Sequence, residues 1–130
     1  MGKATAHAVV LDVGALIAFE RGDVRMRALC RRALVSGAQL VIPAGVVAQV
    51  FRDRGRQVAL RALLTSVTSR VIPLDQPLAE AIGILCGRSR TKDIVDASVV
   101  LVARRERARV VTSDVEDLRH LDPSLPMERI

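Results

Sequence analysis

The chain has 130 residues, half of them hydrophobic, which suits one domain with a substantial core and excludes a mainly disordered protein. Its net charge of +6 and isoelectric point near 10.9 favour an anionic partner, such as nucleic acid, an acidic protein or a membrane surface. Tyr and Trp are absent, which argues against base stacking as the main mode of nucleic-acid binding.

The first half of the chain alternates short β-branched runs with helical patterns. We expect strands over residues 7–13 and 38–43, and helices over residues 14–23, 23–36, 44–57 and 57–67. Gly37 stands where it would end the helix over residues 23–36.

The same alternation continues in the second half. We expect strands over residues 70–74 and 108–114, and helices over residues 76–87, 93–107 and 114–121, with a polar loop between the first two helices. The helix over residues 93–107 is apolar almost all round, so it should be buried. Strands that alternate with helices predict an α/β fold, with a parallel sheet and helices on its faces.

The cysteines and the apolar runs bear on the compartment. Cys30 and Cys86 are far apart and lack the spacing of a metal site, so we expect two buried thiols in a reducing compartment. The longest apolar run, residues 8–19, is too short to span a bilayer and contains an aspartate. Residues 1–7 make a poor signal peptide. We therefore expect a soluble, cytoplasmic protein with one domain over residues 1–130.

Four aspartates fall at or near the expected carboxyl edge of the sheet. Asp12 ends the first strand and Asp114 follows the fourth, while Asp93 and Asp96 begin the buried helix. Ligands of open α/β sheets bind beyond the carboxyl ends of the strands, and residues three apart share one face of a helix. The sequence therefore predicts that these carboxylates converge on one place.

Capping is the competing explanation for most of these acids. Asp93 stands at a helix start, where it serves as a cap as readily as a functional group, and Asp12 is placed to cap the helix beginning near Gly14. Ser113 and Glu116 have the spacing of a capping box. Asp96 lies deeper in the apolar segment, so a cap explains it less well. The other acids that we considered are expected to face solvent, namely Glu20, Asp23, Asp53, Asp75, Glu80, Asp117 and Asp122.

Carboxylates gathered at one edge repel each other, and a hard divalent cation relieves that repulsion. Mg²⁺ binds through a few carboxylates and several waters, and Mn²⁺ prefers similar ligands. Such an ion activates water and stabilises charge on a phosphoryl oxygen. An acidic metal centre in a basic protein predicts phosphodiester hydrolysis, with Asp12, Asp96 and Asp114 as catalytic metal ligands and Asp93 as a further ligand.

Four segments in order resemble a known family. Residues 9–19 (VVLDVGALIAF), 41–53 (VIPAGVVAQVFRD), 93–103 (DIVDASVVLVA) and 109–121 (RVVTSDVEDLRHL) are similar to PIN-domain proteins, and specifically to the VapC-type ribonuclease toxins. The resemblance covers about residues 8–120. It implies an α/β/α sandwich with a mostly parallel sheet of four or five strands, Mg²⁺ or Mn²⁺ as cofactor, and RNA as substrate. It also implies a homodimer inhibited by a cognate antitoxin.

The resemblance also assigns supporting residues and reveals one departure. The acids of the family fall on Asp12, Asp96 and Asp114, and its strand-end hydroxyl falls on Thr112, beside Ser113. Where the family usually has a glutamate after the second strand, this chain has Gln49, which keeps an oxygen but loses the charge. Hence the alternative function is a PIN-like module that binds RNA or a partner with weakened or lost nuclease activity.

Two groups of basic residues flank the acids in the sequence. Arg52, in residues 52–56, and Arg90, in residues 88–92, are the candidates for RNA phosphate contacts, although a solvated surface explains such residues as well. His7 and His120 are isolated, so metal activation of water is preferred to a histidine base. A phosphatase, a phospho-receiver and a dinucleotide-binding fold are disfavoured, the last because no G-x-G-x-x-G follows the first strand.

Overall fold

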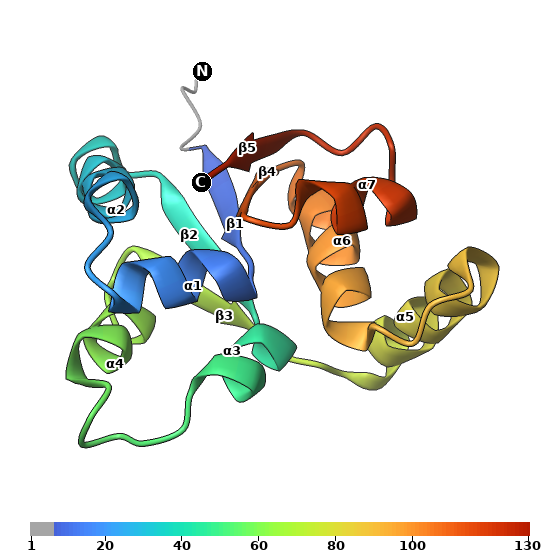
Figure 1. Ribbon diagram of the computed structural model, residues 1–130, viewed down its shortest axis with the longest axis horizontal. Coiled ribbons are helices and arrows are strands. Elements are labelled where there is room, and N and C mark those ends of the chain that lie inside the picture. The colour runs from blue at the N-terminus through green and yellow to red at the C-terminus, as the bar shows by residue number, and fades with distance from the viewer. Residues whose placement is uncertain (1–6) are drawn as a thin grey trace.

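The computed structural model describes residues 7–130 and has a single parallel sheet at its centre (Figure 1). Its strands are β1 (Ala8–Leu11), β2 (Gln39–Pro43), β3 (Ser69–Ile72), β4 (Arg109–Thr112) and β5 (Met127–Arg129). Their order is β3-β2-β1-β4-β5, and every neighbouring pair is parallel. The predicted α/β class is confirmed, with five strands. Six of the seven residues judged for a signal peptide lie outside the described residues.

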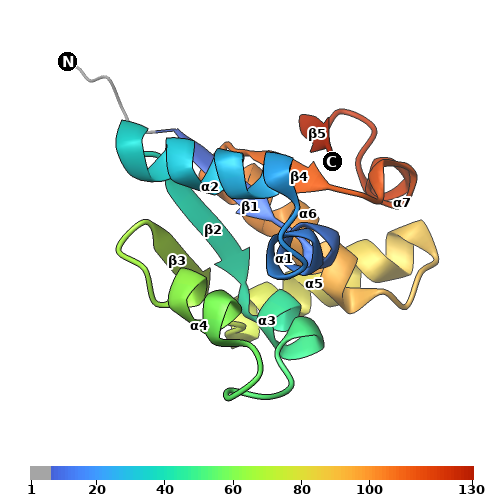
Figure 2. The ribbon, with the colours of Figure 1, turned by 60° about the vertical axis from the view of Figure 1, so that its left-hand side comes forward.

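Helices cover both faces of this sheet. They are α1 (Val13–Glu20), α2 (Val24–Ser36), α3 (Ala44–Val50), α4 (Val58–Leu64), α5 (Gln76–Ser89), α6 (Ile94–Glu106) and α7 (Val115–Leu121). Figure 2 shows α1, α2 and α4 on the near side of the sheet and α5 and α6 behind it. None of these helices is long and apolar enough to cross a bilayer, as far as residues 7–130 are concerned.

The core forms where the central strands meet α6 and α1. Val10 and Leu11 of β1 are fully buried, as expected for a strand of a parallel sheet that is covered on both faces. The predicted burial of α6 is confirmed for most of its length, from Ala97 to Ala103. Cys30 and Cys86 are both buried and free, as the sequence indicated.

Two segments differ from the sequence prediction. The helix expected over residues 44–57 ends at Val50, because the side-chain oxygen of Gln57 accepts hydrogen bonds from the backbone of Arg52 and Asp53 and fixes a loop instead. The strand β5 was not predicted, since its three residues carry almost no periodic signal. It follows Pro126, whose carbonyl accepts a hydrogen bond from Val110 of β4.

Asp23 and Asp75 are exposed, as expected, and also cap helices, whereas Asp122 is buried, so the solvent prediction was wrong for Asp122. Asp23 and Asp75 cap α2 and α5 by accepting hydrogen bonds from Met26 and Leu78. Asp122 is 7% exposed and pairs with Arg104 at 2.9 Å. Asp122 therefore fastens the turn after α7 to the end of α6.

Candidate active site

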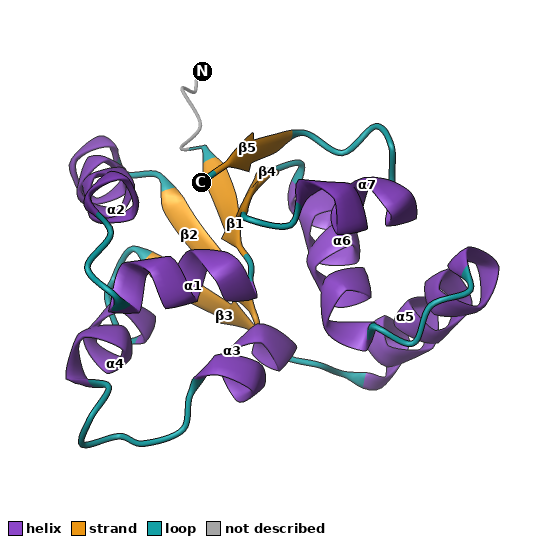
Figure 3. Cartoon of the chain, in the orientation of Figure 1, coloured by secondary structure: helices purple, strands orange, loops and turns teal. Residues whose placement is uncertain are grey.

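The register of the sheet brings Asp12 and Thr112 side by side. Leu11 of β1 is paired with Val111 of β4, so the residues that follow them leave the sheet together at its carboxyl edge. Figure 3 shows the arrowheads of β1, β2 and β3 pointing to the same end of the sheet, close to α3 and to the start of α1. The carboxyl edge of the sheet that the sequence predicted is therefore present, and the pairing of β1 with β4 positions Asp12 there.

Asp12 is buried, at 3% exposure, and is the N-cap of α1. One carboxylate oxygen accepts a hydrogen bond from the backbone N–H of Ala15 at 2.9 Å, so the capping explanation of this residue is correct. The carboxylate also interacts with the Thr112 hydroxyl. The cap bond from Ala15 is accepted by Oδ1.

Burial raises the pKa of Asp12 above its usual value. The hydrogen bond from Thr112 counters this effect on the pKa, as does the one from Ala15, whereas the negative charge of Asp114 adds to it. Asp114 is thus close enough to Asp12 to repel it. Thr112 links the two, because its hydroxyl also accepts a hydrogen bond from the backbone N–H of Asp114 at 2.8 Å.

Asp96 is half-buried in the first turn of α6, and its pKa is raised to about 7. Burial is the largest cause of this raised pKa, followed by the charge of Asp93, a hydrogen bond with Asp93, and the charges of Asp12 and Asp117. Burial and the negative charges of the neighbouring acids therefore both disfavour the ionised form of Asp96. Asp93 is exposed and caps α6 by accepting a hydrogen bond from the Asp96 N–H at 2.9 Å, as the capping alternative predicted.

Asp96 also lines a polar hollow of about 200 Å³ with Asp93, Asp117 and His120. Asp117 is exposed, as expected, but its place beside Asp96 was missed. It follows Asp114 by three residues at the start of a helix, and that spacing was the available signal. His120 is not isolated either, because a ring nitrogen lies 3.0 Å from the carbonyl oxygen of Ser89. His7 precedes β1, at the opposite edge of the sheet.

The predicted capping box of Ser113 and Glu116 is wrong. The N-cap of α7 is Asp114, without a side-chain cap bond, and Glu116 pairs instead with Arg129 of β5. Ser113 and Asp114 are both exposed, so neither is locked inside the core. The Asp114 carboxylate therefore stays at the rim of the site.

Gln49, the departure from the family pattern, lies exposed near the end of α3. Arg52 follows that helix, and its guanidinium donates hydrogen bonds to the carbonyls of Ala48 at 2.7 Å and Phe51 at 2.9 Å. Arg90 is exposed and ends α5 in a left-handed conformation. Both arginines thus have local structural roles, and RNA contact remains a prediction for them.

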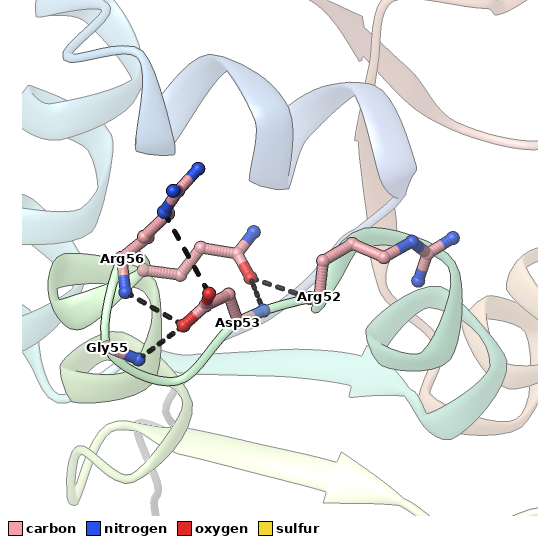
Figure 4. Close-up of polar contacts among 5 residues, drawn as sticks. Arg52, Asp53, Gly55 and Arg56 are labelled. Atoms are coloured by element: carbon pink, nitrogen blue, oxygen red, sulfur yellow. Dashed lines mark hydrogen bonds and ion pairs between the residues drawn. The ribbon is translucent and has the colours of Figure 1, made fainter.

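The loop over residues 51–57 holds its shape through side-chain bonds to the backbone (Figure 4). Asp53 accepts hydrogen bonds from the N–H groups of Gly55 and Arg56, and its second oxygen lies 3.9 Å from the Arg56 guanidinium. Figure 4 shows Arg52 directed away from Asp53 and Arg56. The loop therefore displays exposed arginines on an ordered backbone.

The carboxylates fit a hydrated cation better than a closed protein cage. Within residues 7–130, no three His, Cys, Asp or Glu side chains stand together closely enough to hold a metal by themselves. Mg²⁺ needs only one or two carboxylates, because it keeps several of its waters. Asp12 and Asp96, buried or half-buried and mutually repelling, supply oxygen donors of that kind. The ligand roles of Asp12, Asp93, Asp96 and Asp114 remain predictions.

The raised pKa of Asp96 predicts how stability varies with pH when no metal is present. The folded protein binds this proton more tightly than the unfolded chain, so the stabilisation is complete below the ordinary pKa of about 4. It is lost as the pH rises through the folded pKa of about 7. In EDTA, the melting temperature of Asp96→Asn should equal that of the wild type near pH 4 and exceed it increasingly towards pH 8. Glu80→Gln, an exposed control, should show no such trend; a constant difference for Asp96→Asn would contradict the prediction.

The fold is shared with solved structures of toxin systems, although no protein-family model and no curated protein matches the chain by sequence. A chain of VapBC2 from Rickettsia felis, bound to a promoter DNA fragment, has a TM-score of 0.72 at 15% identity, covering 95% of this chain and 98% of that one. A chain of FitAcB from Neisseria gonorrhoeae has a TM-score of 0.62 at 16% identity, covering 92% and 95%. VapC20 of Mycobacterium tuberculosis, a sarcin-ricin loop cleaving toxin, has a TM-score of 0.59 at 19% identity, covering 81% and 87%. The chain therefore has the PIN-domain fold of these proteins, as the resemblance in its sequence predicted.

Proposed function

We propose that the chain is a metal-dependent endoribonuclease, the toxin of a toxin–antitoxin pair, which hydrolyses RNA phosphodiester bonds with Mg²⁺ or Mn²⁺. The observation that carries the proposal is the electrostatic coupling of Asp12 and Asp96 at the carboxyl edge of a PIN-type sheet. Carboxylates close enough for the charge of one to raise the pKa of another, as Asp12 does for Asp96 and Asp114 for Asp12, are costly to keep together in a merely structural role. A bound cation makes the same arrangement favourable.

Each residue of the site has a distinct role in this proposal. Asp12 and Asp96 would hold the ion, and the exposed carboxylate of Asp114 would add a further oxygen donor at the rim of the site. Thr112 orients the Asp12 carboxylate and fixes the backbone of Asp114. When bound, the ion supplies an activated water and stabilises charge on the phosphoryl oxygen. Asp93 mainly caps α6 by accepting a hydrogen bond from the Asp96 N–H, and its negative charge would also attract the cation.

The positive charge of the chain suits RNA as the substrate. The exposed arginines of residues 52–56 and of the segment before Asp93 offer phosphate contacts on both sides of the acids in the sequence. VapC20, which has the same fold, cleaves the sarcin-ricin loop. We infer a single-stranded or looped RNA, because a phosphate must come close to Asp12, which is buried, and to Asp96, which is half-buried.

A cognate antitoxin is the expected protein partner. VapBC2 and FitAB, which share the fold, are bound to DNA fragments, and FitAB has a TM-score of 0.63 to this chain at 15% identity. A net charge of +6 favours an acidic inhibitor that competes with RNA. The proposal includes a cytoplasmic location, because the protein would meet both its RNA substrate and its antitoxin there.

Gln49 supports a second candidate function, that of a PIN-like module that binds RNA or a partner without cleaving it. The glutamine is exposed on α3 and brings no charge to the edge, so the site lacks the glutamate that the family pattern would lead one to expect there. An RNA cleavage assay separates the two candidate functions, because a module that only binds RNA would retain it without producing fragments.

Cleavage should depend on the buried acids. Structured RNA incubated with the purified protein and Mn²⁺ or Mg²⁺ should be cut at defined positions, and Asp96→Asn or Asp12→Asn should reduce the rate at least a hundredfold, since each removes a charged ligand. Glu80→Gln should cleave like the wild type. Circular dichroism confirms that each variant is folded. RNA binding without cleavage at any metal concentration would favour the binding module.

We also propose that the protein is a homodimer through an apolar groove between α5 and the start of α6. The groove has a volume of about 160 Å³ and is lined by aliphatic side chains of β2, β3, α5 and α6 and of the segments between them, among them Leu74, Ile82 and Ile94. Leu74 is 51% exposed and Ile94 57% exposed, which is unusual for large aliphatic residues around one hollow. A surface so poor in polar groups does not suit RNA, whereas the exposed aliphatic side chains around the same groove of a second copy would remove these residues from water.

Leu74→Asp should separate such a dimer. By light scattering after size exclusion, the wild type should have twice the chain mass of 14.1 kDa and the variant the mass of one chain. Val67→Asp places the same charge on a valine that is 94% exposed and outside the groove, so it should stay dimeric. A wild type that elutes as a monomer at high concentration would contradict the dimer.

A further inference from the structure

Gly14 is the closest point between the first helix and the turn that carries Asp114. A Cβ placed on Gly14 would lie 2.1 Å from Oγ and 3.1 Å from Cβ of Ser113, and 3.4 Å from its backbone nitrogen. Rotation of the Ser113 hydroxyl would relieve the 2.1 Å approach, whereas the 3.1 Å approach to Cβ requires Ser113 itself to shift by a few tenths of an ångström. The other glycines of residues 7–130 show no approach of this kind, the next shortest being 3.4 Å at Gly55.

The backbone of Gly14 does not require glycine for its own conformation. Gly22 and Gly37 have positive φ angles, whereas Gly14 is the second residue of the regular helix α1. Glycine is a poor helix former, and an alanine there would favour the helix. The absence of a side chain at this position is therefore explained by the contact with Ser113 and not by local geometry.

Gly14 and Ser113 both lie next to the aspartates at the carboxyl edge of the sheet. Gly14 follows the cap residue Asp12 by two positions, and its N–H interacts with the Asp12 carboxylate. Ser113 stands between Thr112, which interacts with Asp12, and Asp114, whose charge Asp12 senses. The Ser113 hydroxyl can rotate away from such a Cβ, but the Ser113 Cβ is fixed to the backbone and must give by a few tenths of an ångström. That shift moves the end of β4, which carries Thr112 and leads to Asp114.

We propose that Gly14 is a positioning residue of the acid centre: because it has no side chain, Ser113 packs against the first turn of α1 and holds Asp114 beside Asp12 at a spacing that one hydrated cation bridges. This inference rests on the proposed metal-dependent function. It assigns no ligand role to Gly14, which acts only through the place it leaves for Ser113.

A double-mutant cycle between positions 14 and 113 tests the inference. Ser113→Gly removes both atoms that a Cβ at position 14 would strike most closely, leaving the backbone nitrogen at 3.4 Å. The variants are therefore Gly14→Ala, Ser113→Gly and the double variant. Gly45→Ala is the matched control, because Gly45 is likewise the second residue of a helix, α3, and its Cβ would meet Val95 at 3.7 Å, an ordinary contact.

Two readouts are measured for each variant: the Mn²⁺ dissociation constant by calorimetry, and the melting temperature in EDTA. Gly14→Ala should weaken Mn²⁺ binding about tenfold or more, the usual effect of disturbing residues that orient metal ligands. In the Ser113→Gly background the same substitution should cost much less affinity. It should also lower the melting temperature in EDTA only when Ser113 is present. Gly45→Ala should bind Mn²⁺ like the wild type.

The outcomes separate this inference from the proposed function. Wild-type affinity in Gly14→Ala, or an equal loss of affinity with and without the Ser113 side chain, would overturn the positioning role while leaving metal binding intact. A wild type that does not bind Mn²⁺ would overturn the proposed function and the cation spacing with it. In that case the melting temperatures in EDTA still decide whether the steric contact exists.

Discussion

Mutual repulsion between carboxylates that have lost much of their water is the constraint on which this edge of the molecule depends. Asp12 is buried, and Asp96 lies in the first turn of a helix that is apolar for most of its length. Desolvation and like charge both disfavour their ionised forms, which is why the pKa of Asp96 rises to about 7. The fold must therefore hold the acids together against their own electrostatics, and a cation or a proton relieves the strain.

The scaffold supplies this restraint through bonds that also build the helices. Asp12 caps α1 with one oxygen and Asp93 caps α6, so the local structure at two helix starts is tied to the acid edge. Thr112 connects the β1 end to the β4 end. The parallel register of β1 and β4 sets the starting point for all of them. Capping of α1 by Asp12 does not exclude the proposed ligand role, because the cap bond from Ala15 uses one of its two carboxylate oxygens.

Local patterns in the sequence predicted the parallel sheet and most of the helices, whereas the convergence of the acids on one metal remains a prediction. They failed where the deciding contact is distant or made by a single side chain. The side chain of Gln57 accepts a hydrogen bond from the backbone N–H of Arg52, and α3 ends before that residue. The strand β5 is formed by pairing with β4, which is distant from any local pattern in its three residues. Asp122 pairs with Arg104, which is 18 residues away in the sequence, so a local sequence pattern cannot predict this pair. The contact between Gly14 and Ser113 is longer still in sequence and is visible only in three dimensions.

A crystal of the protein grown or soaked with Mn²⁺, measured at a wavelength where manganese scatters anomalously, tests the central claim most directly. The account predicts one anomalous peak at the carboxyl edge of the sheet, coordinated by carboxylate oxygens of Asp12 and Asp96 and completed by waters. Peaks confined to other surfaces, with the Asp12 and Asp96 carboxylates facing apart and free of metal at saturating Mn²⁺, would contradict it.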